Sequence, residues 1–326
     1  MSTKVTAKPK SSRTRSAKPA VFIDGEAGTT GLEIRRRLTA IAGLEVHSIV
    51  RDKRKDEAAR LDMMRAADVV VLCLPDEAAK EAVALAATLG DKAPKIVDAS
   101  TAHRVAEGWV YGFPELQAGQ AETIARAKLV SNPGCYATGA IALIRPLVDT
   151  GLLPADVPLT INAVSGYSGG GRSMIEAYEA GSAPAFELYG LGLEHKHLPE
   201  IVRYTGLKRR PIFVPSVGDF RQGMLVSVPL HLDELPDRPS ARDLEAALVR
   251  HYTGARLVKV VPADDASAKG GRLDALALND TDVMELRVFA NDKHRHAVLV
   301  ARLDNLGKGA SGAAVQNIGL MLGVAT

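Results

Sequence analysis

Residues 20–38, AVFIDGEAGTTGLEIRRRL, place an apolar run, a glycine-rich turn and an amphipathic helical pattern in direct succession. Further apolar strand patterns lie at 44–50, 67–75, 95–100 and 127–132, with helical patterns between several of them. The run at 67–75 is nearly all apolar, which is typical of a strand covered on both faces. Because strands alternate with helices, we predict a parallel, doubly wound sheet of Rossmann type.

The pattern changes in the second half of the chain, where strands follow one another with fewer helices between them. Apolar strand patterns lie at 158–166, 212–217, 223–232, 257–262, 283–291 and 296–306. Stretches this rich in strands are typical of a mixed or antiparallel sheet, so we predict a second, α+β domain. The final stretch, 308–323, has the pattern of a helix. A chain of 326 residues is long enough to build both cores.

The turn in the first segment carries a GxxGxxG pattern. Gly25, Gly28 and Gly31 stand between the strand and the helix, with Thr29 and Thr30 at the expected helix start. Glycines there allow a tight turn and let the backbone approach a pyrophosphate at the helix N-terminus. We therefore predict a dinucleotide site at this loop; the alternative is an ordinary glycine turn.

The end of the second strand bears on which dinucleotide binds. An NAD site places an acid about 20 residues after the glycines, to hold the ribose 2′-hydroxyl. This chain has the cationic stretch RDKRK at 51–55, which suits the 2′-phosphate of NADP(H). Ser48 and Arg51 lie nearest the strand end and are the preferred candidates. The alternative is an exposed charged loop.

A lone cysteine stands at a helix start in SNPGCYATG, residues 131–139. Pro133 and Gly134 turn the chain, and an apolar helical pattern runs from Cys135 to about Val148. A helix N-terminus lowers the pKa of a thiol, and its free N–H groups can hold an oxyanion. We predict that Cys135 is a nucleophile, whereas Cys73, inside VVVLCLP, has the setting of a buried structural cysteine.

A nucleophilic thiol needs a proton acceptor, and the stretch EHKHLPEI offers candidates. His195 and His197 stand two residues apart, and Glu200 could orient one of the imidazoles. His195 is our first candidate for the acid/base and His197 the second. The alternative is a pair of surface histidines.

The composition excludes several function classes. No apolar run approaches the roughly 20 residues of a membrane span, and the N-terminus has no apolar signal-peptide core. Two cysteines and no HExxH motif argue against a disulfide framework and against a metal site, and they suit the reducing cytoplasm. Residues 1–18 hold six Lys and Arg and no acid, so the remaining 35 basic residues are outnumbered by 38 acidic ones. We predict a disordered basic tail, with a transit peptide as the alternative, and no nucleic-acid binding by the body.

Taken in order, GxxGxxG, SNPGCYATG, HKHLPEI and DNLGKGASGAAVQNIGLMLG resemble the N-acetyl-γ-glutamyl-phosphate reductase family, the NADPH-dependent reductases of arginine biosynthesis. The resemblance runs from about residue 20 to the C-terminus. The chain is shorter than the commoner form of that family and departs from it at DASTAHR and SVGDFRQGM. It therefore resembles the short, second type.

The resemblance implies a reaction in which the Cys135 thiolate attacks the acyl phosphate of N-acetylglutamyl 5-phosphate and forms a thioester, which NADPH reduces to the semialdehyde. It implies a phosphate-binding role for Arg104 and a nicotinamide contact for Asn305. The substrate anions call for further cations, for which Arg172 and Arg221 are candidates. Asn132 is a further substrate-binding candidate, and Ser165 and Gly166 lie in a Gly/Ser loop expected near the nicotinamide.

The resemblance also implies an organisation. We expect a cofactor domain of residues 19–134 and 307–326, made discontinuous by the returning C-terminal helix. Residues 135–306 form the expected catalytic and oligomerisation domain, in a homodimer or homotetramer. Three other functions stay open: aspartate-semialdehyde dehydrogenase, a cysteine acyltransferase or hydrolase without redox chemistry, and a non-catalytic dinucleotide sensor with a nucleic-acid-binding tail.

Overall fold

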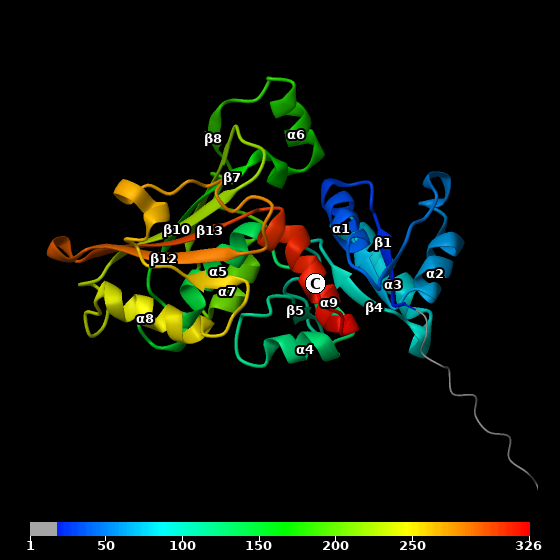
Figure 1. Cartoon of the computed structure of the whole chain (residues 1–326), viewed down its shortest axis with the longest axis horizontal. Helices are drawn as coiled ribbons and strands as arrows, with labels where there is room; N and C mark the ends of the chain where they lie inside the picture. Colours follow the sequence, from blue (N-terminus) through cyan, green and yellow to red (C-terminus); the bar gives the residue numbers. More distant parts are fainter. Residues whose placement is uncertain (1–17) are drawn as a thin grey trace, which may run out of the picture.

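The computed structural model describes residues 18–326, except the side chains of residues 266, 267 and 269. The predicted disordered tail therefore lies, apart from Lys18, outside the described residues. Two sheets stand side by side, with the C-terminal helix between them (Figure 1). Within the described residues no helix is long and apolar enough to cross a membrane.

The first sheet is wholly parallel, with strand order β2-β1-β3-β4-β6-β5. The predicted Rossmann-type sheet is thereby confirmed. Its strands are β1 (Ala20–Asp24), β2 (Glu45–His47), β3 (Val69–Leu72), β4 (Lys95–Asp98), β5 (Val110–Tyr111) and β6 (Leu129–Ser131). Its helices are α1 (Thr29–Thr39), α2 (Glu57–Ala66), α3 (Asp76–Ala87), α4 (Gln120–Arg126) and α9 (Gly312–Leu322), with short 3-10 turns η1 (Arg51–Lys53) and η2 (Gly90–Lys92).

Successive residues of the central strands pack against helices on opposite faces of the sheet. Val21 and Ile23 of β1 pack in one cluster with residues of α1, α4 and α9, whereas Phe22 packs in another with residues of α2 and α3. Both faces are covered, which explains the nearly continuous apolar run of β3. The C-terminal helix thus belongs to the core of the first sheet.

The second sheet is mixed, as predicted, with strand order β11-β12-β13-β10-β7-β9-β8. Its strands are β7 (Thr160–Gly166), β8 (Phe186–Leu188), β9 (Ile212–Gly218), β10 (Met224–His231), β11 (Val258–Val260), β12 (Met284–Asn291) and β13 (His296–Leu303). Its helices are α5 (Cys135–Asp149), α6 (Arg172–Glu179), α7 (Leu198–Thr205) and α8 (Ala241–Tyr252). Short turns are η3 (Tyr167–Gly170), η4 (Ala266–Gly271), η5 (Asp292–His294) and the π-helical η6 (Gly307–Ser311).

Helix α5 lies against one face of this sheet and is buried along most of its length. Its Gly139 allows a close approach to β10, because a Cβ there would lie 2.8 Å from a methyl carbon of Val226. This packing places the first residue of α5 at the junction of the two sheets, beside η6. A π-helical turn inside a helix is frequent at functional sites.

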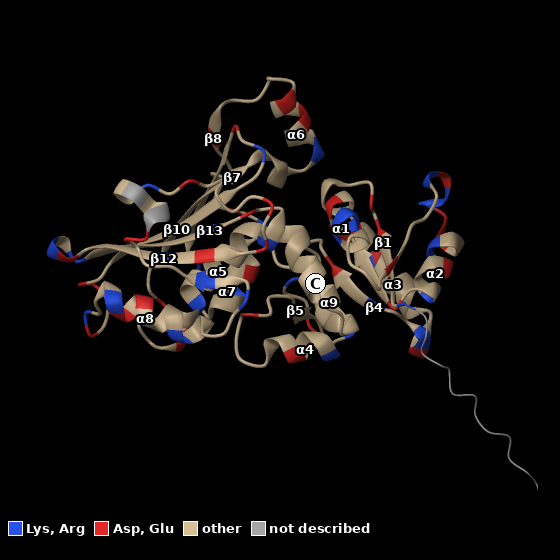
Figure 2. Ribbon diagram, in the orientation of Figure 1, with Lys and Arg blue, Asp and Glu red and all other residues tan. Residues whose placement is uncertain are grey.

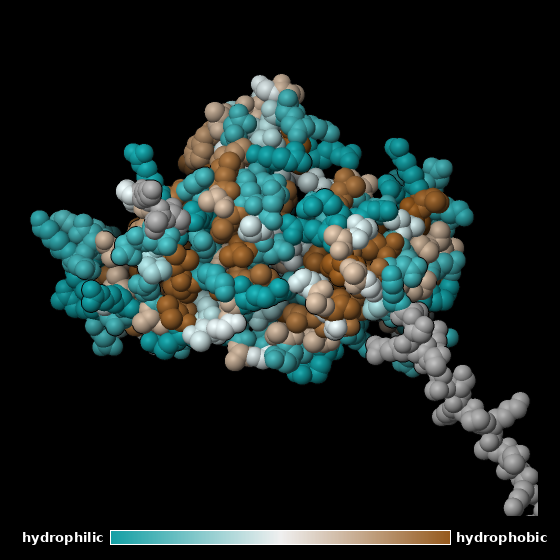
Figure 3. Space-filling view, in the orientation of Figure 1, coloured by the Kyte–Doolittle hydropathy of each residue, from teal (hydrophilic) through white to brown (hydrophobic). Residues whose placement is uncertain are grey.

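The opposite face of the second sheet is apolar and open. Phe186 and Leu188 of β8 are 57% and 49% exposed, and Val298 of β13 is also exposed. Figure 3 shows apolar residues reaching the surface beside β7 and β8. In the ribbon of Figure 2, acidic and basic residues are interspersed over both domains, and α9 carries neither.

Candidate active site

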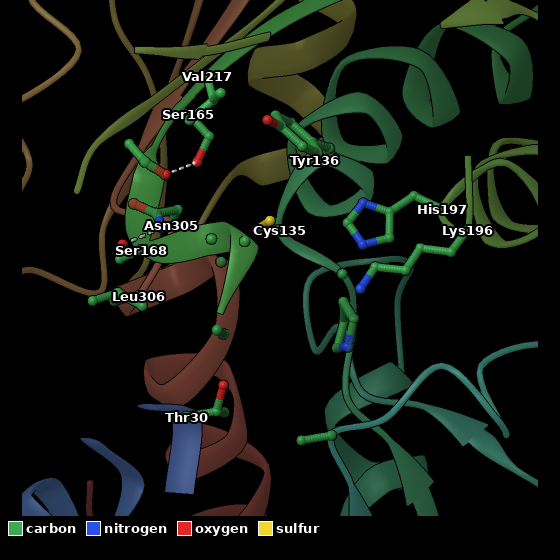
Figure 4. A pocket seen from close by; sticks show the side chains of 18 of the residues that line it. Thr30, Cys135, Tyr136, Ser165, Ser168, Lys196, His197, Val217, Asn305 and Leu306 are labelled. Carbon is green, nitrogen blue, oxygen red and sulfur yellow. Dashed lines mark hydrogen bonds between the residues drawn. The ribbon is translucent and has the colours of Figure 1, made fainter. Parts of the chain in front are cut away.

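A cavity opens where the two sheets meet, at the N-terminus of α5. Many sequence-predicted residues from distant segments line it: Thr30, Arg104, Asn132, Cys135, Ser165, Gly166, His195, His197 and Asn305. Figure 4 shows the Cys135 sulfur between two walls, with Ser165, Ser168 and Asn305 on one side and Lys196 and His197 on the other. No cluster of metal-ligating side chains was found among the described residues.

Cys135 is the first residue of α5, directly after the N-cap Gly134, which is extended and forms no side-chain cap. Burial raises the pKa of the Cys135 thiol, and the Arg104 guanidinium and the Tyr136 N–H only partly offset this effect. The expected net fall in that pKa is therefore wrong for this structure, because the thiol is enclosed. At neutral pH the resting group is a thiol. Burial raises the pKa of Cys73 to about 12, and Cys73 does not line the cavity.

Both imidazoles reach the cavity and both are neutral at physiological pH. Burial lowers the pKa of His195 to about 4, and burial also holds the pKa of His197 well below its usual value. His197 is only 4% exposed, and its Nδ1 has no hydrogen-bond partner among the described residues. Its Nε2 would lie 2.4 Å from a Cβ on Gly134, so only glycine fits before the cysteine.

The tautomer of His195 follows from one backbone contact. The N–H of His197 donates to Nδ1 of His195 over 3.2 Å, so a neutral His195 carries its proton on Nε2. In this tautomer His195 presents a hydrogen-bond donor at Nε2. It takes up a second proton only at Nδ1, which requires the backbone contact to break.

Glu200, expected to orient an imidazole, has other partners. Its carboxylate is 1% exposed; Oε1 lies 2.6 Å from Nη1 of Arg104, and Oε2 accepts from the Tyr111 hydroxyl at 2.7 Å and the Gly134 N–H at 3.1 Å. Within the described chain neither oxygen hydrogen-bonds to an imidazole. Glu200 instead holds the guanidinium and the turn before the cysteine.

Arg104 and Asn132 are held from several sides. Nε of Arg104 donates to the Asn132 carbonyl at 3.2 Å, and Nδ2 of Asn132 donates to the Ala310 carbonyl at 3.0 Å. Arg104 is buried, yet it lines the cavity. Its guanidinium is therefore a fixed cation beside Cys135, as a residue that binds a substrate anion requires.

On the opposite wall, the amide of Asn305 is already engaged by the protein. Its Nδ2 donates to Oγ of Ser168 at 2.9 Å, and its Oδ1 accepts from the Gly223 N–H at 2.8 Å. Oγ of Ser165 donates to the Gly166 carbonyl at 3.0 Å. Asn305 thus fixes the Gly/Ser loop, and the predicted nicotinamide contact would have to share these bonds.

The glycine loop has the geometry that a pyrophosphate requires. Gly25 has a φ of +88°, and a Cβ there would lie 2.3 Å from the Cys73 carbonyl oxygen. A Cβ on Gly31 would lie 2.6 Å from Cα of Glu26, whereas the space above Gly28 is open to 3.7 Å. Helix α1, which begins at Thr29, has no capping side chain. Its first N–H groups are therefore free of a side-chain partner, and the loop fits a dinucleotide.

A cationic cluster lies at the end of β2, centred on the buried Glu26. The Arg35 guanidinium donates to the Glu26 carboxylate at 2.7 Å and also hydrogen-bonds the Ser48 hydroxyl. The Ser48 hydroxyl in turn donates to Glu26 at 2.9 Å. The Arg54 guanidinium donates to the other oxygen of Glu26 at 3.3 Å. Arg51 is exposed in η1, and its side chain forms no hydrogen bond or ion pair with the described residues. Arg35 was missed by sequence reasoning, because its place on α1 is distant from the strand end in the chain.

Two predicted substrate arginines lie outside the cavity. Nη2 of Arg172 donates to the Ala27 carbonyl of the glycine loop at 3.1 Å, and Arg221 forms an exposed ion pair with Glu179 at 2.9 Å. Conversely, Lys196 lines the cavity although it was not singled out within the HKH stretch. Gly309 was also missed; a Cβ there would lie 2.9 Å from Cβ of Cys135.

Two family models match separate parts of the chain. Residues 20–124 match the family described as semialdehyde dehydrogenase, NAD binding domain, and residues 135–305 match semialdehyde dehydrogenase, dimerisation domain. The chain is 52% identical over 317 residues to N-acetyl-gamma-glutamyl-phosphate reductase 2 of Nostoc sp., covering 94% of this chain and 98% of the relative. It is 56% identical over 311 residues to N-acetyl-gamma-glutamyl-phosphate reductase of Brucella ovis, covering 94% and 99%.

The fold is also that of a solved structure. Aspartate semialdehyde dehydrogenase II of Vibrio cholerae, complexed with ASA, superposes with a TM-score of 0.66 at 15% identity, covering 94% of this chain and 99% of that one. At this identity the likeness concerns the fold alone.

Proposed function

The chain belongs to the N-acetyl-γ-glutamyl-phosphate reductase family, and we propose that it reduces N-acetyl-L-glutamyl 5-phosphate to N-acetyl-L-glutamate 5-semialdehyde and phosphate. The reductant is NADPH, and the reaction is a step of arginine biosynthesis. The observation that carries this proposal is Cys135 at an uncapped helix start, with neutral imidazoles on one wall and the Gly/Ser loop on the other. The two cysteines are free, which fits a cytoplasmic enzyme.

In the first step the sulfur of Cys135 attacks the acyl carbon while an imidazole takes the thiol proton. The bond from sulfur to carbon forms and the bond from carbon to the phosphate oxygen breaks. The imidazolium returns its proton to the leaving phosphate. The N–H groups at the start of α5 face the oxyanion that forms on the way. An acyl thioester on Cys135 and hydrogen phosphate result.

The nicotinamide cofactor, when bound, supplies the hydride that reduces this acyl group. Gly25, Gly28 and Gly31 with the start of α1 would hold its pyrophosphate, and Ser165, Gly166 and Ser168 would flank its nicotinamide end. Reduction produces a thiohemiacetal oxyanion at the same N–H groups. Its collapse releases the aldehyde and the Cys135 thiolate, and the thiolate takes a proton from solvent that the imidazole relays.

We assign the preference for NADPH over NADH to the cluster at the end of β2. Arg35 and Arg54 present guanidinium groups there, Ser48 adds a hydroxyl, and Arg51 stands exposed nearby. A guanidinium fork suits a phosphate monoester. Glu26 keeps these cations in place before the cofactor arrives.

The assembly and the domain division are part of the same proposal. The cofactor domain comprises residues 19–134 and 307–326, which share a core through α9. Residues 135–306 carry the open apolar face with Phe186, Leu188 and Val298, and we assign the dimer interface to it. A homodimer would bury this face, and two dimers would form a tetramer. Light scattering of Leu188→Asp, expected to give monomers, tests the assignment.

The deciding experiment runs the reaction backwards. Wild-type protein should reduce NADP⁺ in a phosphate-dependent manner with N-acetyl-L-glutamate 5-semialdehyde, and far less with L-aspartate 4-semialdehyde. The reverse preference would favour aspartate-semialdehyde dehydrogenase, the alternative that the fold also allows. Acyl-phosphate hydrolysis without any reduction of NADP⁺ would favour a cysteine hydrolase instead.

A further inference from the structure

Lys196 is a cation of the cavity wall that has no partner among the residues that the structure describes. Arg104 is paired with the buried Glu200 at 2.6 Å, so this pair has no net charge. His195 and His197 are neutral, because burial lowers the pKa of each. Lys196 lines the same cavity and is exposed, and its side chain forms no hydrogen bond or ion pair with the described residues. Lys196 is thus the net positive charge of the cavity lining.

Lys196 and Arg104 act on the same side of the nucleophile. Figure 4 shows the Lys196 side chain extending along the wall of His197 and facing the cavity, across from Ser168 and Asn305. Nη1 of Arg104 would lie 2.5 Å from a Cβ on Gly134, the residue before Cys135. Arg104 and Lys196 line the same cavity as Cys135, and the positive charge of each favours the Cys135 thiolate.

Asp76, an acidic group on which the charge of Lys196 acts, is already engaged elsewhere. The Asp76 carboxylate accepts from the N–H and the hydroxyl of Thr101, and Lys196 lowers its pKa without an ion pair forming. A lysine that served only to neutralise Asp76 would be expected to contact it. The ammonium keeps three donors available for a ligand in the cavity.

We propose that Lys196 is a substrate-binding residue that, together with Arg104, forms an anion subsite for the phosphoryl group of the acyl phosphate. The assignment rests on the proposed function. The phosphoryl group is attached to the carbon that Cys135 attacks, so it must lie beside the sulfur, where both cations act. The substrate carboxylate lies at the far end of the carbon chain. In the reverse direction the same subsite binds inorganic phosphate.

Steady-state kinetics of the reverse reaction test this subsite. Lys196→Gln should raise the KM for inorganic phosphate by about 10-fold to 100-fold, the loss expected for one hydrogen bond to a charged group. The KM values for the semialdehyde and for NADP⁺ should stay within about twofold, and Lys196→Arg should recover most of the phosphate affinity. Lys208→Gln makes the same charge change on an exposed lysine outside the cavity and should match wild type.

A second measurement needs no substrate. In a Cys73→Ala background, Cys135 is alkylated either by iodoacetate, which is negatively charged, or by iodoacetamide, which is neutral. Lys196→Gln should lower the ratio of the two rates about fivefold or more, and Lys208→Gln should not. Inorganic phosphate should slow the alkylation of Cys135 by iodoacetate more strongly in the parent protein than in Lys196→Gln.

The two measurements separate the subsite from the reaction. If the parent protein shows no phosphate-dependent turnover while its iodoacetate preference depends on Lys196, the proposed function fails and the anion subsite stands. If turnover is normal but the phosphate KM and the alkylation ratio of Lys196→Gln match those of Lys208→Gln, the subsite is overturned. A rise in the semialdehyde KM instead of the phosphate KM overturns it as well, because Lys196 would then bind the carboxylate.

Discussion

Arg104 and Glu200 form a buried ion pair, with Nη1 and Oε1 2.6 Å apart, directly beside the turn that starts the Cys135 helix. The same carboxylate accepts the Gly134 N–H, so one acidic group positions both the cation and the nucleophile's helix. Glu200 therefore acts on the reaction through Arg104 and Gly134.

Glu200→Gln should shift the alkylation of Cys135 to lower pH. Glu200 raises the pKa of that thiol and Arg104 lowers it, so loss of the carboxylate charge leaves the guanidinium uncompensated. The rate of iodoacetamide alkylation against pH measures this shift. A carboxylate that served to orient a basic imidazole would produce no such downward shift. Glu200→Ala should also cost about 3–5 kcal/mol of unfolding free energy, because it leaves a buried charge unpaired.

Cys135→Ser should abolish turnover and leave NADPH binding nearly intact. Oxygen is a far poorer nucleophile than sulfur under these conditions, and the glycine loop that is proposed to bind the cofactor lies on another element. Turnover and fluorescence titration with NADPH measure the two effects. Cys73→Ala is the control and should keep its turnover number, with a loss of stability of about 1 kcal/mol. Turnover above a few per cent in Cys135→Ser would contradict the nucleophile assignment.

Arg35→Ala combined with Arg54→Ala should weaken NADPH binding by about 1.5–3 kcal/mol for each charged hydrogen bond lost, with little effect on NADH. Both guanidinium groups converge on Glu26, and Arg35 also contacts Ser48, where a 2′-phosphate would lie. Dissociation constants for the two cofactors give the comparison. Arg51→Ala tests the residue predicted from the strand end in the same way. If these variants lose affinity for NADPH and NADH equally, the loop has only a structural role.

His195→Asn and His197→Asn should separate the roles of the two imidazoles. If His195 is the acid/base, its replacement should slow turnover by about 10²–10⁴ and act mainly on kcat. His197→Asn should then act mostly through the KM of the substrate. Melting temperatures of both variants control for folding, because His197 is buried. Near-normal kcat in His195→Asn, with the loss in His197→Asn, would reverse the assignment.

The unfolding free energy should fall as the pH drops from about 6.5 towards 4. The pKa of His195 is about 4 in the folded protein, against an ordinary value of 6.5 for a solvated imidazole, and the pKa of His197 also lies well below 6.5. The unfolded chain therefore binds more protons in this window. The contribution of the two neutral imidazoles to the unfolding free energy is complete above pH 6.5 and is lost as the pH falls below it. Urea unfolding at several pH values measures the slope. His195→Asn should show a shallower slope, and an unchanged slope would contradict a buried neutral imidazole.

The sequence by itself determined the features that depend on neighbours in the chain. Continuous apolar runs placed β1 and β3, and successive strand patterns with few helices between them indicated the mixed second sheet. Gly25 and Gly31 marked a turn that tolerates no Cβ. Cys135 could be placed at the start of α5 because Pro133 and Gly134 break the chain immediately before it. The strands β5 and β8, only two and three residues long, left no pattern that could be recognised.

Tertiary structure decided everything that depends on which distant segments meet. Glu200 could be paired with Arg104 only once α7 had docked beside α5, and Arg35 joined Ser48 only across α1 and β2. Arg172 and Arg221 had the chemistry of substrate ligands but lie outside the cavity. The pKa of Cys135 rose where a helix N-terminus alone predicted a fall, because desolvation depends on how completely the fold encloses the sulfur. Enclosure is a property of the packed molecule, and no local stretch of sequence encodes it.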